Sequence, residues 1–497
     1  MKTRKYLIVT VLLLLVGSTT LSQNVTGKII DSNTQNPIPF ATVQYAKNDG
    51  VVANAEGYFN FSTENKAPVE QLTISCMGYL TTFITVEQLR SQNFVIALEE
   101  AVNELGTVYI TNKFPSVDTI MKRVQQNLKT NYSVQLTKST IFSRETSYFK
   151  PNLVSLEIDK STGFSKERLK STNRQLDSLG HSIVNSAPSH QFKDVLADFY
   201  SLDANTSKIE LLKATLLDDE KNKGTFDNIQ KKATNIILKH LNINKTYKLK
   251  TGLFKVEDSL SLKNSENKKE DEKKDIVLDF KQNAQKFLNQ YYFDEGSVLD
   301  FVKDTSIYEY TIENVTSLDG KPVFVIHFVP KKAKAKYVGR LYVTEEDYAV
   351  ARIDYQFAEG KKGESLNLKL LFGIKFAENA RKVTAIYKKN DATDLYHLSY
   401  VSEEIGQYVY VHRPLKFIEN GPGKNKVAFD LKLDGNTIEK RELLNLGTQT
   451  ITADNYNGVK EAKKIEYVKL KQYDPVIWKD YTVIEPLNEM KQFKVEE

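Results

Sequence analysis

The histidine and carboxylate side chains are the residues of this 497-residue chain that could bind a metal or catalyse a reaction. Zinc hydrolases hold their ion with closely spaced histidines and a glutamate, and they leave one coordination position open for water. No histidine here has a histidine or glutamate partner at such a spacing. The histidines are His181, His190, His240, His327, His397 and His412. The sequence therefore predicts no metal site.

Other residue types that can catalyse reactions also lack the pattern that catalysis requires. Glu345-Glu346 lies in a predicted hairpin turn, where carboxylates are solvated, and no nucleophile elbow, phosphate-binding loop or dinucleotide fingerprint occurs. Cys76 is the only cysteine, which excludes an intramolecular disulfide and a thiolate zinc site, and we expect it to be a small buried hydrophobe. We therefore predict no catalytic residue, no cofactor and no enzymatic activity. A hydrolase with an unrecognised site, dependent on His397 or His412, is the contrary hypothesis.

Residues 1–22 have the pattern of a secretory signal peptide. Lys2, Arg4 and Lys5 form its charged start, Tyr6–Val16 its apolar centre, and Thr20–Ser22 its small-residue cleavage site. An uncleaved anchor is the weaker alternative, because the apolar centre is shorter than the ~20 residues of a membrane-spanning helix. Removing the signal lowers the formal net charge from +6 to +3, and so small a charge does not indicate nucleic-acid binding.

Residues 23–112 contain short runs of alternating apolar residues separated by turn residues, which predicts a β-sandwich. Asp49-Gly50 and Asn54–Gly57 interrupt the runs, since glycine readily adopts the positive φ of tight turns. Seven strands are expected, at residues 25–30, 41–45, 59–61, 72–76, 83–86, 94–98 and 108–110.

This stretch also resembles a known family. The segments that carry the resemblance are Val25–Asp31, Pro39–Val43, Asn54–Phe59, Ser75–Tyr79 and Leu105–Ile110. Their types and order are similar to those of the carboxypeptidase regulatory-like domain, a transthyretin-like β-sandwich that is often found at the N-terminus of Bacteroidetes envelope proteins. The resemblance implies a seven-stranded sandwich and a cell-envelope setting, but it implies no chemistry.

Residues 113–300 are predicted to be a linker helix followed by a mainly helical middle region. Apolar residues share one face of a helix over 116–131, and residues 141–158 alternate as a strand does. Residues 191–241 carry two stripes at helical spacing. The stripes are Phe192, Val195, Leu196 and Phe199, then Ile229, Ala233, Ile236, Ile237 and Leu241. Residues 263–275 are almost all polar or charged, and we expect a disordered loop there.

Residues 301–497 are predicted to form a curved antiparallel β-meander that ends in a strap, residues 473–486, packed over the sheet. The passage from Tyr308 to Phe357 resembles part of the half-barrel of bacterial lipoprotein carriers, in which a curved sheet holds a helix or an acyl chain. That resemblance implies a concave, ligand-binding apolar face. Its candidate residues are Phe324, Ile326, Phe328, Ile353 and Tyr355.

The sequence as a whole predicts a multidomain, mainly β protein that is exported to the periplasm or the outer membrane and acts as a non-catalytic binding or scaffold module. Its expected partners are an envelope protein, a glycan or a lipid, with no nucleic acid and with peripheral or no membrane contact. The alternative function is a carrier of a lipid or other hydrophobic ligand in the C-terminal half-barrel. A TonB-dependent receptor, which can begin with the same sandwich, is rejected because too few strands remain for its barrel of about 22.

Overall fold

The computed structural model describes residues 24–46, 49–63, 69–101, 115–132, 136–162, 165–186, 188–203, 205–218, 235, 241–242, 244–251, 254–261, 276–293, 297–390 and 392–494. The chain divides into two compact units. Unit 1 is Met1–Ala101 together with Asp474–Leu487, and unit 2 is Val102–Tyr473 together with Asn488–Glu497. The predicted signal peptide, the predicted strand at 108–110 and the predicted loop at 263–275 all lie outside the described residues.

Unit 1 contains a β-sandwich of two small sheets. The first has the order β4-β1-β7 and the second the order β3-β2-β5-β6. The strands are β1 (Asn24–Asp31), β2 (Thr42–Gln44), β3 (Gly50–Val52), β4 (Tyr58–Ser62), β5 (Gln71–Ser75), β6 (Thr82–Thr85) and β7 (Val95–Leu98). Alternate residues of both sheets, such as Ile29, Phe59 and Leu72, are fully buried between them. The mainly β sandwich is confirmed, although β3 falls where we expected turns, and Cys76 is buried as predicted.

The C-terminal strap packs on this sandwich, so the prediction that it covers the large sheet is wrong. Its residues 474–487 belong to unit 1. The fully buried Asn54 donates from Nδ2 to the carbonyl oxygens of Glu485 (3.0 Å) and Pro486 (3.3 Å). The hydroxyl of Thr482 lies 3.4 Å from that of Tyr45. The amide of Asn54 thus bonds to a part of the chain more than 400 residues away in the sequence, a pairing that no local pattern reveals.

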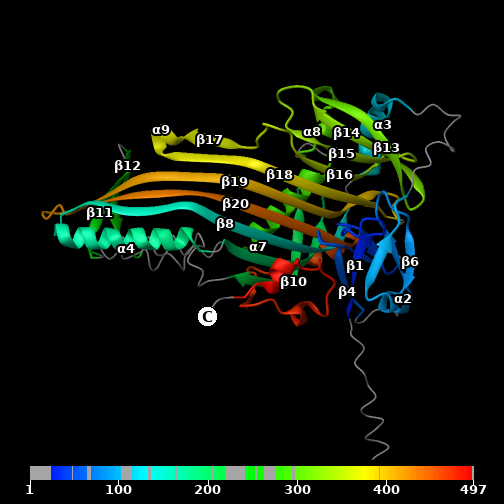
Figure 1. Cartoon of the computed structure of the whole chain (residues 1–497), viewed down its shortest axis with the longest axis horizontal. Coiled ribbons are helices and arrows are strands. Elements are labelled where there is room, and N and C mark those ends of the chain that lie inside the picture. Colours follow the sequence, from blue (N-terminus) through cyan, green and yellow to red (C-terminus); the bar gives the residue numbers. More distant parts are fainter. Residues whose placement is uncertain are drawn as a thin grey trace, which may run out of the picture. The chain divides into compact units, whose positions relative to one another are not determined.

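Unit 2 is built on one large curved sheet, fourteen-stranded within the described residues, with the principal order β13-β14-β15-β16-β18-β19-β20-β8-β9-β10-β21 (Figure 1). All its pairings are antiparallel except that of β10 with β21. The strands are β8 (Thr137–Ser161), β9 (Ser189–Ser201), β10 (Ser207–Asp218), β11 (Thr246–Thr251), β12 (Phe254–Ser261), β13 (Tyr308–Leu318), β14 (Lys321–Pro330), β15 (Tyr337–Thr344), β16 (Val350–Phe357), β17 (Ser365–Leu368), β18 (Ile374–Lys389), β19 (Tyr396–Glu419), β20 (Lys426–Thr450) and β21 (Val468–Leu470). The predicted C-terminal meander is confirmed.

Two predictions about the middle of the chain are wrong. The stripe Phe192–Phe199 lies in strand β9, where Val195 and Phe199 face one core and Phe192 faces another. Because both faces of β9 are buried, its apolar residues imitate helical spacing. Residue 300 is also no domain boundary, since β20 pairs with β8 along its length and joins the two regions in one sheet. Of the second stripe, only Leu241 lies among the described residues, where it is buried.

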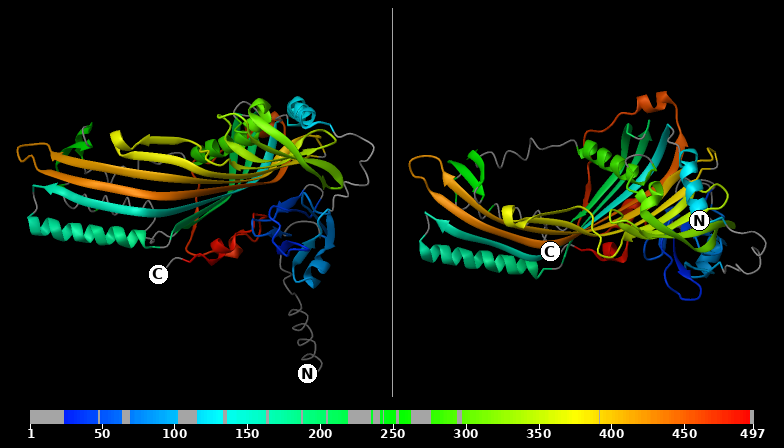
Figure 2. Two further views of the ribbon diagram at one scale, coloured as in Figure 1. Left: turned by 45° about the horizontal axis from the view of Figure 1, so that its top comes forward. Right: turned by 90° about the horizontal axis from the view of Figure 1, so that it is seen from above.

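Helices cover the concave face of the sheet (Figure 2). They are α3 (Val117–Asn131), α7 (Ile276–Tyr291) and α8 (Asp300–Lys303), and they share one core with the strands. Helix α3, the predicted linker helix, is confirmed, and the Ser116 hydroxyl caps its N-terminus by accepting from the Thr119 N–H. No helix among the described residues has the length and apolar character needed to cross a membrane.

Helix α4 (Lys166–Val184) protects the far end of β8, where β9 no longer pairs with it. Asn173 imitates a neighbouring strand, because its side chain accepts from the Ile158 N–H (2.9 Å) and donates to the Ile158 carbonyl (3.1 Å). Gly180 permits the close approach, since a Cβ there would lie 2.2 Å from the Val154 carbonyl oxygen. The helix thus covers an edge that would otherwise be open to pairing with another chain.

Candidate functional site

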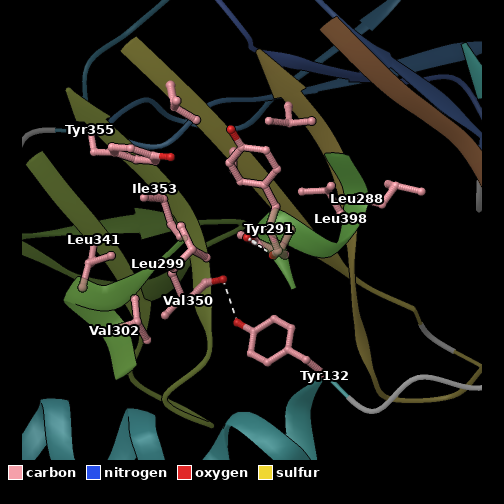
Figure 3. Close-up of a cluster of buried hydrophobic side chains, with 14 of the residues drawn as sticks. Tyr132, Leu288, Tyr291, Leu299, Val302, Leu341, Val350, Ile353, Tyr355 and Leu398 are labelled. Carbon is pink, nitrogen blue, oxygen red and sulfur yellow. Dashed lines mark hydrogen bonds between the residues drawn. The ribbon is translucent and has the colours of Figure 1, made fainter. Parts of the chain in front are cut away.

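The five predicted ligand-binding residues lie together on the concave face of the sheet, but the protein's own side chains cover them. Phe324, Ile326 and Phe328 come from β14, Ile353 and Tyr355 from β16, and none is more than 3% exposed. The ring of Phe301, in α8, stacks on Phe328 with centroids 4.3 Å apart and lies 5.0 Å from that of Tyr355. Figure 3 shows Leu299 beside Ile353, and Val302 near Leu341 and Val350, in the same cluster. The expected apolar groove is therefore filled in this structure.

A buried polar network fixes the end of α7 to the sheet beside this cluster. Tyr291 donates from its hydroxyl to Glu403 (3.0 Å) and accepts at its carbonyl from the Tyr387 hydroxyl (2.6 Å). Arg381 bridges Glu403 (3.0 Å) and Glu378 (2.7 Å). Burial raises the pKa of Glu403, an effect that Arg381 opposes. The network positions α7, and because both carboxylates are buried and paired, it is not arranged as an exposed acid–base couple.

A cavity of about 90 Å³ remains between α7 and the ends of strands β8, β9, β19 and β20. One wall of the cavity is a face of α7 and the residue that follows the helix. It consists of Gln285, Leu288, Asn289 and Tyr292, which are at helical spacing. Asn390, Thr393 and Leu395, between β18 and β19, border another side. The cavity is a second feature of the concave face, and it shares none of its lining residues with the five predicted ones.

Hydroxyl and amide groups at the strand ends line the floor of the cavity. The Ser139 hydroxyl of β8 lies 2.8 Å from the Thr448 hydroxyl of β20. Asn445 donates from Nδ2 to the same Thr448 hydroxyl (2.8 Å) and to the Leu398 carbonyl (3.2 Å). Thr137, Ser201 and Thr450 complete this polar floor. Strand alternation places these residues on one face, so the pleat of the sheet itself builds the floor.

The rings of Tyr132 and Tyr396 line the cavity, and their hydroxyl groups form hydrogen bonds with residues outside the lining. Tyr132 donates to the Val350 carbonyl (2.7 Å), as Figure 3 shows, and Tyr396 donates to a carboxylate oxygen of Asp347 (3.1 Å). The two ring centroids are 5.7 Å apart. These hydrogen bonds fix both rings, so the cavity has an aromatic wall that needs no reorganisation to receive a ligand.

The chemical character of the lining is neutral. Among its twenty residues none is an aspartate, glutamate, lysine or arginine, and ten carry an aliphatic hydroxyl or a carboxamide. Within the described part of the chain, no group of three or more His, Cys, Asp or Glu side chains could hold a metal ion. The arrangement can accept and donate hydrogen bonds to a ligand, but it offers no pair of groups for general acid–base chemistry.

The two histidines of the hydrolase hypothesis do not meet. Both lie on β19, and fifteen residues of strand separate them by roughly 50 Å. His397 contributes to the cavity lining, and burial, with a smaller effect of Lys388, lowers its pKa to about 4. His412 is partly exposed and contacts Asp430, with 2.8 Å between Nε2 and Oδ1. Nothing in this placement forms a two-histidine site.

The fold and site define a multidomain, mainly β protein with a small N-terminal sandwich and a large curved sheet that encloses a neutral cavity. Residues 25–110 match the model of the CarboxypepD_reg-like domain, so the resemblance noted in the sequence is confirmed for the sandwich. No curated protein matches the chain.

Two solved structures show a faint likeness to this chain. One is a DUF1329 family protein from Desulfovibrio piger, with 10% identity and a TM-score of 0.19 over 69% of this chain and 97% of that one. The other is MucB in complex with MucA(peri), with 7% identity and a TM-score of 0.14 over 68% of this chain and 99% of that one. Such TM-scores support no inference about fold or function.

Proposed function

We propose that this protein is an exported, non-catalytic binding module of a bacterial cell envelope, and that it holds a small ligand in the cavity beside α7. The observation that carries the proposal is the cavity itself, because it joins a prepared aromatic wall to a floor of hydroxyl and amide groups. Sites for small molecules commonly combine apolar walls with a few placed polar groups in this way.

The character of the two units supports a role without catalysis. The sandwich belongs to a domain family that carries no active site in this sequence, since none of the six histidines falls within residues 25–110. The cavity lining includes no carboxylate and no amine, and its one histidine has a pKa lowered to about 4, so its imidazole is neutral near pH 7. The signal-peptide pattern of residues 1–22 supports export.

Native mass spectrometry of protein purified from its own envelope tests the proposal. Asn289→Trp places a large ring against the cavity from α7, whereas Gln282→Trp adds the same ring at an exposed position of that helix two turns away and outside the cavity lining. We expect a small molecule to co-purify with the wild type and with Gln282→Trp, and to be lost from Asn289→Trp. An empty wild type, or equal occupancy in Asn289→Trp, would refute the role of the cavity. Conversion of the bound molecule on incubation would refute the absence of catalysis.

Binding of a hydrophobic ligand at Phe324, Ile326, Phe328, Ile353 and Tyr355 stays a prediction. It requires α8 to leave the concave face, because Phe301 occupies the space that an acyl chain would take. The cavity beside α7 needs no such movement and is therefore the better-supported site.

A further inference from the structure

The lining of the cavity is selective about the charge of a ligand. Its twenty residues include no aspartate, glutamate, lysine or arginine. A carboxylate, a phosphate or an ammonium group placed there would lose hydration and gain no opposite charge, which costs far more than burying a neutral polar group. The cavity therefore favours a ligand without formal charge.

The lining also favours a ligand that can form hydrogen bonds. Hydroxyl and carboxamide groups reach the cavity from β8, β9, β20 and α7, and from Asn390 and Thr393. Several of these groups already bond to one another, as Ser139 does to Thr448, but a hydroxyl oxygen has two lone pairs as well as its hydrogen, so it can form further bonds. A ligand with several hydroxyl groups can use this remaining capacity, which a purely apolar molecule leaves unused.

The aromatic wall adds a second requirement. The rings of Tyr132 and Tyr396 border the same space as the polar floor. A pyranose sugar has C–H groups on its ring faces and hydroxyl groups around its rim, so it can pack against the rings and bond to the floor together. At roughly 30 Å³ per water in the liquid, a cavity of about 90 Å³ has the volume of about three waters, so it can take the edge of one sugar residue with its hydroxyl groups rather than the whole ring.

We infer that the cavity binds a neutral sugar residue, free or as part of a glycan. This inference rests on the proposed binding function and names its ligand class. It excludes uronic acids, phosphorylated sugars and acyl chains as ligands of this cavity, and it assigns recognition to the hydroxyl pair Ser139–Thr448 together with Asn445.

Isothermal titration with matched probes tests the ligand class on the full chain. The neutral probes are the methyl pyranosides of glucose, galactose, mannose and N-acetylglucosamine; methyl glucuronide supplies the same ring with a charge, and cyclohexylmethanol supplies a ring without hydroxyls on it. We expect at least one neutral glycoside to bind at least tenfold more tightly than both comparison probes. Equal or tighter binding of the glucuronide or of cyclohexylmethanol overturns the ligand class, as does failure of all four neutral probes.

A double variant, Ser139→Ala with Thr448→Val, tests the assigned residues. The two hydroxyls bond to each other, and Asn445 keeps its bond to the Leu398 carbonyl when it loses the one to Thr448, so removing both hydroxyls together should change the melting temperature little. Affinity for the best neutral glycoside should fall at least tenfold, while Thr437→Val on the same strand, outside the cavity lining, should leave it unchanged. Unchanged affinity in the double variant overturns the assignment. If native mass spectrometry finds the cavity occupied by a charged or apolar molecule, the binding function stands and only the sugar inference fails.

Discussion

Replacing Phe301 by alanine tests whether the concave apolar face of the sheet is closed by the protein's own side chains. Phe301 is fully buried and lies among Tyr308, Phe328, Tyr337 and Tyr355, with ring centroids 4.3 to 6.1 Å away. Its removal leaves a gap lined by aromatic rings. Because these rings belong to paired strands and cannot collapse freely, most of the gap should persist.

The magnitude follows from burial and ring contacts. Phe→Ala changes in protein cores cost about 3–5 kcal/mol, and each lost aromatic pair adds roughly 0.5–1.5 kcal/mol beyond area alone. Without assuming that these terms add, we expect unit 2 of Phe301→Ala to lose about 4 kcal/mol of unfolding free energy. Leu370→Ala, at a side chain with 101% relative exposure, should change it by less than about 0.5 kcal/mol.

Urea denaturation followed by far-UV circular dichroism measures the loss, and it should be repeated with and without benzene. The new space is apolar, so benzene should stabilise Phe301→Ala and have no such effect on the wild type. A loss below about 1 kcal/mol would show that α8 does not pack as described. Stabilisation of the wild type by benzene at this site would show that the groove is open, and would revive the hydrophobic-ligand carrier.

Three further predictions concern the packing of single residues. Gly180→Ala should destabilise unit 2 by about 1–3 kcal/mol in thermal melts, because the new Cβ would lie 2.2 Å from the Val154 carbonyl oxygen. This loss is expected even though alanine has a better helix propensity than glycine. The control Ser182→Ala, on the exposed face of the same helix, should be neutral in the same melts. Asn54→Ala should cost unit 1 about 3 kcal/mol, since its amide bonds both the strap and the backbone of Glu56 and Tyr58, and limited proteolysis should then release the strap. Burial raises the pKa of Glu403, so the folded state holds this proton to a higher pH than the unfolded chain does. The free energy of unfolding should therefore fall as the pH rises above the ordinary carboxyl pKa of about 4.3. Glu403→Gln should flatten that part of the measured profile of unfolding free energy against pH.

The spacing of apolar residues predicted some of the helices and strands. The alternation of Val323 to Val329 identified β14, and the spacing of Ile120, Met121 and Val124 identified the buried face of α3. The pattern of Phe192 to Phe199 failed because β9 is buried on both faces, and a strand of that kind has no alternation to detect. The junction of β8 with β20 failed for another reason, since Thr137 and its partner Thr450 are more than 300 residues apart in the sequence.

The sequence did not reveal the candidate site, because no motif or unusual spacing marks its residues. Thr137, Ser139 and Thr448 look like polar ends of strands, and Gln285 and Asn289 look like the solvated face of a helix. One signal was present: Gln285, Leu288, Asn289 and Tyr292 mix polar and apolar residues on a single helical face, which is unusual for a face packed against a purely apolar core. By contrast, the five residues predicted from the sequence do lie together in one core, but α8, which covers them, has only four residues, too few for a periodic signal.

The closed groove and the open cavity lie on the same concave face, so the difference between them must come from which side chains cover each part. Over β14 and β16, α8 brings Phe301 and Val302, and apolar residues meet apolar residues without a gap. Over the ends of β8 and β20, α7 brings Gln285 and Asn289, and the strands contribute hydroxyl groups to the same space. Aliphatic side chains in that space would contact these polar groups without bonding to them, whereas charged side chains would be buried without a partner of opposite charge. A neutral ligand with several hydroxyl groups satisfies both conditions, and for that reason we place recognition at the polar end of the sheet.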